Sequence, residues 1–193
     1  MLRQSGRTRL VGFVVVACVL VGAGVAYSAA SPSAKLAKQD RAYGGGQFGP
    51  GCFTPILCFV AARNLAVDAH SEGDGSEPVG NSTYGAPGGF ESIRNVTCLR
   101  VEGSRGVIGG VIVAGADTGF WYAQYFVDRG GPSAGPGSRD LVSPSFTDAA
   151  NAPSWPAGFP YTCPSPTTGF AGGEPVYLEL DEGDIVVQDA PQN

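Results

Sequence analysis

The clearest hydrophobic pattern lies in the middle of the chain. Residues 93–102 and 107–113 are rich in Val and Ile, and a four-residue loop bounded by glycine separates them. Two such runs around a short glycine-containing loop predict a β-hairpin. The loop 115–119 then leads into the aromatic run 120–128, so we expect a three-stranded meander.

Shorter β-patterned runs flank this meander. We expect further strands at residues 59–70, 78–84, 140–146, 176–180 and 185–187. The last two should flank an acidic turn at 181–184, whereas the Gly- and Pro-rich segments 129–139 and 147–173 should be irregular. No stretch keeps a helical period over three turns. The pattern therefore predicts an all-β fold, an antiparallel β-sandwich or partly open barrel of about 7–9 short strands.

A different pattern opens the chain. Three arginines precede an uncharged run from Leu10 to Ala26, and small residues follow it up to Ala30. This order predicts a secretory signal or signal-anchor helix over residues 1–30. Three outcomes are open: cleavage near Ala30, retention of the apolar run as a membrane anchor, or lipid attachment at Cys18. The third is the weakest, because the apolar stretch continues beyond Cys18.

Each outcome places residues 31–193 outside the cytosol, either secreted or anchored to a membrane. Residues 31–46 are polar, lack a hydrophobic period and end in three glycines, so they predict a flexible tether. Residues 47–191 should form a single β-domain. With 43% hydrophobic residues in the chain, we do not expect disorder over most of it.

The charge balance narrows the range of partners. The first 30 residues hold three of the 12 Lys and Arg residues and none of the 17 Asp and Glu residues, which leaves a net charge of −8 on the rest. Such an acidic domain is poorly suited to nucleic acid or to anionic lipid. We expect membrane contact only through residues 10–26, if they are not removed, and a cell-envelope or protein partner whose identity the sequence does not give.

Four cysteines follow the predicted signal. An even number in an exported chain predicts two disulfides, and three pairings are open. We favour Cys52–Cys58 as a local loop and Cys98–Cys163 as a long-range bond. The Cys-x5-Cys spacing is not one that zinc sites use, so we expect neither a metal nor another cofactor.

Several motifs occur in a fixed order. They are Gly-Gly-Gly at 44–46, Val-Thr-Cys-Leu-Arg-Val-Glu-Gly at 96–103, Val-Ile-Gly-Gly at 107–110, Val-Asp-Arg-Gly-Gly at 127–131 and Gly-Asp-Ile-Val-Val-Gln-Asp-Ala-Pro at 183–191. Together they resemble an uncharacterised family of exported β-domains, mostly from high-GC Gram-positive bacteria, over about residues 44–191.

The resemblance implies a secreted β-sandwich of unknown function, and it supplies no catalytic residues. It supports the Cys98–Cys163 pairing, because the strand cysteine of the family tends to have a partner late in the domain. The chain departs from the family at Cys52 and Cys58. It also reads Asp-Arg-Gly at 128–130, where relatives often read Asp-Asn-Gly.

Candidate chemistry gathers around the only histidine. Asp68 and His70 would share one face of a strand, as an oriented base requires, but no Gly-x-Ser-x-Gly motif accompanies them. We therefore favour a surface histidine. Asp68, Glu72 and Asp74 are weak calcium candidates, because the EF-hand pattern places Val79 where a bidentate glutamate is needed.

Two further acidic sites are also weak calcium candidates: the turn 181–184, and Asp128 with Asp140. The aromatic run offers a candidate ligand platform of Trp121, Tyr122 and Tyr125. Packing under a loop such as 129–139 is the favoured alternative.

The sequence thus predicts an exported, non-enzymatic β-domain that binds or supports cell-envelope or extracellular material. Its support is mainly the lack of a catalytic constellation. One alternative is a secreted hydrolase that uses Asp68 and His70 or an acidic pair such as Asp128 and Asp140. Another is a calcium-stabilised adhesive module.

Overall fold

The computed structural model describes residues 39–52, 58–59, 61–72, 76–88, 91–130, 138–169 and 174–190. Within these ranges, no helix has the length and apolar character needed to cross a membrane. The predicted signal or anchor over 1–30, with Cys18, lies outside them.

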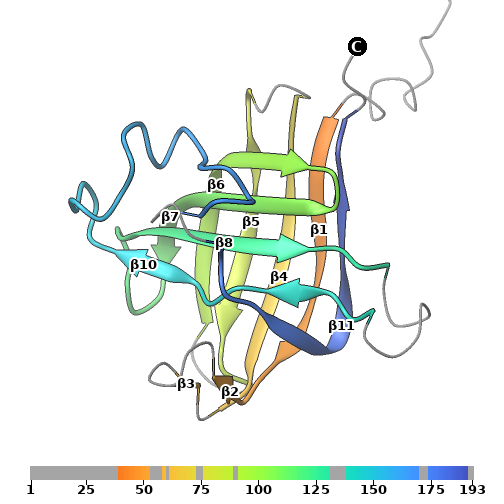
Figure 1. Cartoon of the computed structure of the whole chain (residues 1–193). Helices are drawn as coiled ribbons and strands as arrows, with labels where there is room; N and C mark the ends of the chain where they lie inside the picture. Colours follow the sequence, from red (N-terminus) through yellow and green to blue (C-terminus); the bar gives the residue numbers. More distant parts are fainter. Residues whose placement is uncertain are drawn as a thin grey trace, which may run out of the picture. The chain divides into compact units, whose positions relative to one another are not determined.

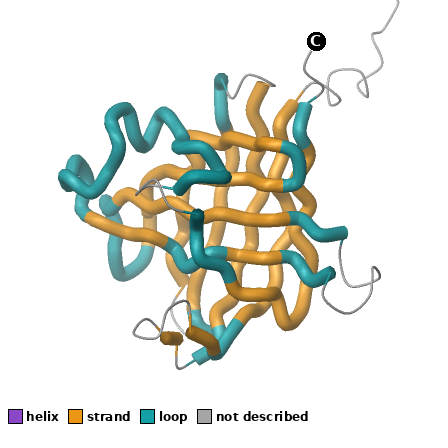
Figure 2. The backbone as a smooth tube through the Cα atoms, in the orientation of Figure 1, coloured by secondary structure: helices purple, strands orange, loops and turns teal. Residues whose placement is uncertain are grey.

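The described residues form strands joined by turns and loops (Figures 1 and 2). The strands are β1 (Gln39–Phe48), β2 (Gly51–Cys52), β3 (Cys58–Phe59), β4 (Arg63–Glu72), β5 (Val79–Gly85), β6 (Glu91–Glu102), β7 (Arg105–Ala114), β8 (Trp121–Val127), β9 (Leu141–Val142), β10 (Phe146–Asp148) and β11 (Leu178–Gln188).

Eight strands close an antiparallel barrel. Their order is β8-β7-β6-β5-β4-β1-β11-β9, and β9 also pairs with β8, which completes the ring. In Figure 1, β1, β4 and β5 run up the page behind β7 and β8, which cross in front of them. The expectation of an all-β antiparallel fold is confirmed, but the observed barrel is closed, whereas a sandwich or a partly open barrel was expected. Closure removes the unpaired strand edges that a sandwich or an open barrel would leave.

The predicted meander is confirmed as β6, β7 and β8. The pairing of β6 with β7 contains two register shifts, one between Ile93 and Arg94 and one between Val96 and Cys98, and the second leaves Thr97 as an extra residue of β6. Because strand side chains alternate, an extra residue reverses which side chains point inward. Val96 and Leu99 thus both join the barrel interior, while Cys98 packs on the outside.

The predicted tether is corrected at its C-terminal part. Residues 39–46 form most of β1, which pairs with β4 on one side and β11 on the other. The glycines belong to this strand because neighbouring backbone approaches it closely. Gly44 has a φ of 117°, and a Cβ there would collide with the carbonyl oxygen of Asp184. Glycine at this point therefore permits strand packing and does not mark a linker.

The C-terminal pair of short strands is also corrected. β11 runs without a break from Leu178 to Gln188, so the predicted acidic turn 181–184 lies within the strand. Residues 182–186 pair with β1, and the acidic side chains face solvent. Backbone pairing with β1 thus prevails over the turn-forming composition.

The barrel interior is filled by side chains from seven of the eight barrel strands, and Tyr84 of β5 packs against them. The buried apolar set is Ala42, Phe48, Leu65, Val67, Ala69, Val96, Leu99, Val101, Ile108, Ile112, Tyr122, Phe126, Val142, Leu180, Ile185 and Val187. Eight-stranded barrels are just wide enough for such packing, or for one small ligand. The interior of this barrel is therefore a packed core.

A second apolar cluster lies on the outer face of β6, β7 and β8. Residues 149–169, here called the strap, form a long loop on one side of the barrel (Figure 2). In the strap, Trp155 and Phe159 stack with ring centroids 4.4 Å apart, and Trp121 of β8 packs against both. Gly109 makes room for them, because a Cβ there would lie 2.5 Å from the Phe159 ring.

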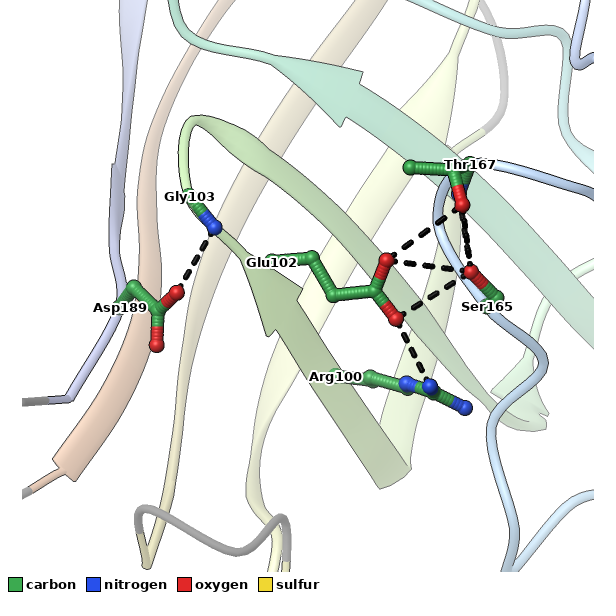
Figure 3. Close-up of polar contacts among 6 residues, drawn as sticks. All are labelled: Arg100, Glu102, Gly103, Ser165, Thr167 and Asp189. Atoms are coloured by element: carbon green, nitrogen blue, oxygen red, sulfur yellow. Dashed lines mark hydrogen bonds and ion pairs between the residues drawn. The ribbon is translucent and has the colours of Figure 1, made fainter. Parts of the chain in front are cut away.

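Covalent and polar contacts hold the strap in place. The Cys98–Cys163 disulfide joins it to β6, as predicted. Farther along, the Glu102 carboxylate accepts hydrogen bonds of 3.2 Å from the Ser165 hydroxyl and 3.4 Å from the Thr167 hydroxyl, and forms a 2.7 Å ion pair with Arg100 (Figure 3). The Thr97 hydroxyl of β6 also donates to the Pro160 carbonyl at 2.7 Å. The strap is thus attached to β6 by a disulfide and by several polar contacts.

The other predicted disulfide falls in the small β2–β3 ladder. Cys52 stands opposite Cys58 in the strand register, and Cys52 is disulfide-bonded. The side chain of Cys58 lies outside the described residues, so the Cys52–Cys58 pairing stays a prediction, now with a register that suits it.

Candidate anion-binding pocket at the barrel mouth

One end of the barrel holds a pocket of about 340 Å³. It is bounded by the start of β4, the β5–β6 turn, the β7–β8 loop and the segment that joins β9 to β10. Its polar lining includes Arg63, Tyr84, Ser92, Arg94, Asp117 and Ser145. Its size lies at the lower end of the range usual for small-molecule sites.

Arg94 is the central residue of this pocket. It occupies an inward position of β6, two residues before Val96, and only 3% of its surface is exposed. The guanidinium carbon lies 4.5 Å from the ring centroid of Tyr84 and 4.9 Å from that of Tyr122. The cation is therefore held between two aromatic rings, a geometry that favours it electrostatically.

Two serines fix the plane of the guanidinium. Arg94 Nε donates to the Ser92 hydroxyl at 2.9 Å, and Nη1 donates to the Ser145 hydroxyl at 2.8 Å. Ser92 itself donates to the Tyr84 carbonyl, which ties it to β5. No hydrogen bond joins Nη2 to any described residue. One edge of the arginine fork is thus positioned by the protein without an acceptor of its own.

No ion pair neutralises Arg94 within the described part of the chain. Burial lowers its pKa to about 10, while the neighbouring Tyr122, Tyr84 and Asp117 act in the opposite direction. The group therefore carries its charge at neutral pH. A buried charge without a counter-ion is costly unless something else compensates for the lost hydration.

The aromatic partners of Arg94 remain neutral near pH 7. Burial raises the pKa of Tyr122 to about 12, and it also raises the pKa of Tyr84, against the positive charges of Arg63 and Arg94. Neither phenol can therefore serve as the missing counter-ion at that pH. A carboxylate or phosphate bound at Nη2 would complete the arginine fork and supply the missing negative charge.

The residues predicted for calcium or hydrolysis do not line this pocket. Asp68, His70 and Glu72 alternate with the core residues of β4, which places all three on the outer face of the barrel. Asp74 lies outside the described residues. Among the residues that are described, no group of three or more His, Cys, Asp and Glu side chains could hold a metal ion.

The predicted acidic pair has another role. Asp140 Oδ2 accepts from the Ile185 backbone amide at 2.8 Å, and Asp128 Oδ2 accepts from that of Val187 at 3.0 Å. On β11, pairing with β9 covers only Leu178 and Glu179. The two carboxylates therefore accept hydrogen bonds from β11 amides beyond the end of that pairing. Their oxygens are occupied in closing the barrel, which argues against the pair as a catalytic acid and base.

The candidate aromatic platform is corrected as well. Tyr122 and Tyr125 are fully buried, on opposite faces of β8, and Trp121 packs under the strap. The favoured alternative of packing under a loop therefore describes these residues, although the covering loop is the strap and not residues 129–139. Tyr122 reaches the pocket through its contact with Arg94.

The central residue of the pocket was missed in the sequence. Simple alternation along β6 places Arg94 on the face of Arg100 and Glu102, opposite Leu99 and Val101, and so predicts an exposed side chain. The extra residue at Thr97 reverses this phase and turns Arg94 inward. No pattern in the sequence marks the position of that extra residue.

Comparisons with known proteins found no matching family model, curated protein or solved structure.

Proposed function

We propose that this chain is an exported, non-enzymatic binding module and that its barrel mouth binds a small ligand through an anionic group. The observation that carries the proposal is the Arg94 guanidinium, which is buried, oriented by two serines, and still has Nη2 available in an open pocket. Sites of this kind are suited to carboxylates and phosphates.

Export is supported by the N-terminal signal pattern and by the Cys98–Cys163 disulfide, since such bonds persist mainly in oxidising compartments. A non-enzymatic role is favoured because the pocket lining holds no nucleophile with an adjacent base. The calcium-module and hydrolase alternatives have less support, because their residues lie on the outer face of β4 or close the barrel seam.

The test is a titration of the purified, oxidised protein with butyrate, inorganic phosphate and 4-aminobutyrate at pH 7. The Arg94 Nε–H resonance is followed by NMR. We expect at least one probe to give a saturable shift, with a dissociation constant of roughly millimolar or tighter. Replacement of Arg94 by Met should abolish it, because the charge and the fork are both lost.

The matched control is Arg100→Met, which removes an arginine from the outer face of the same strand. Its binding should equal that of the wild type, read from the same probes by calorimetry. The proposal is wrong if none of the three probes binds, or if binding survives in a folded Arg94→Met protein.

A further inference from the structure

The pocket lining also contains a carboxylate, that of Asp117, which affects the kind of anion that the pocket can accept. Asp117 lies in the β7–β8 loop, is exposed to solvent, and lines the same pocket as Arg94. Its charge is close enough to act on the Arg94 guanidinium. No ion pair joins the two residues, so their opposite charges are held apart across the mouth.

Hydrogen bonds fix the conformation of the β7–β8 loop that carries Asp117. The β7–β8 loop is tied to β7, because the Ile112 amide donates to the Phe120 carbonyl at 2.9 Å and the Gly119 amide donates to the Ile112 carbonyl at 2.8 Å. The Asp117 carbonyl in turn accepts from the Phe120 amide at 2.9 Å. The loop therefore presents Asp117 at a fixed place relative to β6 and β7.

A simple anion at Arg94 would be repelled by Asp117. A ligand that also carries a positive group would be attracted to it, provided that its two charges are spaced as Arg94 and Asp117 are. From this we infer that the pocket selects zwitterions of the amino-acid type, with the carboxylate at Arg94 and the ammonium group at Asp117. This inference rests on the proposed function.

Other residues of the pocket lining suit such a ligand. Tyr84 packs against Arg94, and small residues, Gly85 and Ala86, follow it in the lining. A short methylene chain between the two charged groups of the ligand would thus contact an aromatic ring and aliphatic atoms. The ammonium group of the ligand would pair with Asp117.

The experiment compares each ω-amino carboxylate with the carboxylate of the same length. Butyrate is paired with 4-aminobutyrate and pentanoate with 5-aminopentanoate, and binding is measured by calorimetry at pH 7 and low salt. We expect the amino form of at least one pair to bind about three- to fivefold more tightly, because ion pairs at exposed carboxylates contribute modestly.

Replacement of Asp117 by Asn should remove this advantage and strengthen binding of the plain carboxylate by about twofold. The control is Glu91→Gln, which removes an exposed negative charge from the start of β6 without altering the pocket lining. The control should keep the preference of the wild type for the amino form.

The outcomes separate the two proposals. If plain carboxylates bind through Arg94 and the amino forms bind no better, the inference is wrong and the proposed function stands. A preference that persists in Asp117→Asn likewise overturns the inference. If the amino form alone binds, and Arg94→Met abolishes it, both proposals are supported. If no probe binds, both are wrong.

Discussion

The two faces of β8 carry aromatic side chains into very different surroundings. On the outer face, Trp121 packs with Trp155 and Phe159 beneath the strap, next to a disulfide. On the inner face, the adjacent residue, Tyr122, lies against the Arg94 cation at an open mouth. The first cluster is closed, apolar and covalently fastened, whereas the second holds a charge that its own surroundings do not neutralise.

Under the proposed function, the strap cluster stabilises the fold and the barrel mouth binds the ligand. Apolar burial and a long covalent loop stabilise the fold, so the strap cluster should contribute mainly to stability. A buried cation contributes little to stability, since the cost of desolvation offsets its attractions. The barrel mouth should therefore matter for binding far more than for folding.

The largest effect on stability should come from removing the strap disulfide with Cys98→Ala and Cys163→Ala together. The bond closes a loop with a sequence separation of 65, so its loss should lower the free energy of unfolding by about 4 kcal/mol, measured in urea. Binding of the probes at the mouth should be unchanged in the protein that remains folded.

The matched variant is Cys52→Ala with Cys58→Ala, where the predicted loop is far shorter and the expected loss is about 2 kcal/mol. An equal loss in the two double variants, or a loss of probe binding without the strap bond, would contradict the division of tasks.

A second prediction concerns pH and the two buried tyrosines of β8. Burial raises the pKa of Tyr122 to about 12 and raises the pKa of Tyr125 as well. Below about pH 10, both phenols are neutral in the folded and the unfolded chain, and their contribution to stability is intact. Above that pH the unfolded chain loses these protons first, so stability falls as pH rises.

For Tyr122 alone, the loss should reach about 2 kcal/mol by pH 12. The measurement is urea unfolding from pH 8 upward, with tyrosinate absorbance recorded in parallel. Tyr122→Phe and Tyr125→Phe should each reduce the alkaline loss. Tyrosinate formation by either residue near pH 10 in the folded protein would show that its side chain is not buried.

The smallest expected effect belongs to Arg94→Met as a stability variant. Because an apolar side chain of similar length avoids the desolvation cost, the free energy of unfolding should change by no more than about 1 kcal/mol. Urea unfolding of the oxidised protein, beside Arg100→Met, measures it. A loss above about 3 kcal/mol would make Arg94 a structural residue and remove the contrast between mouth and strap.

Most of the fold could be predicted from local pattern. The Val- and Ile-rich runs of β6 and β7 and the glycine-bounded loop between them predict the hairpin. The even number of cysteines predicts two disulfides but leaves three pairings open, of which the favoured Cys98–Cys163 bond is observed. The first strand, β1, could not be predicted in this way. Its three glycines have the composition of a linker, and only the nearby backbone of β4 and β11 explains them.

The candidate site was harder to predict, because its residues come from separate parts of the chain. Tyr84, Arg94 and Asp117 meet only when β5, β6 and the β7–β8 loop come together at one end of the barrel. Asp128 and Asp140, which the sequence offered as a candidate acidic pair, instead accept hydrogen bonds from β11 amides where the barrel closes.

The extra residue at Thr97 has a consequence for how this chain can vary. Counting from Arg94, an uninterrupted strand would direct Cys98 toward the same side as the arginine. The cysteine would then point away from its partner in the strap. The single-residue insertion is what allows a charge in the lumen and a sulfur bridge on the exterior only four positions apart. A homologue that lacked one residue here would have to give up either the inward cation or the outward crosslink.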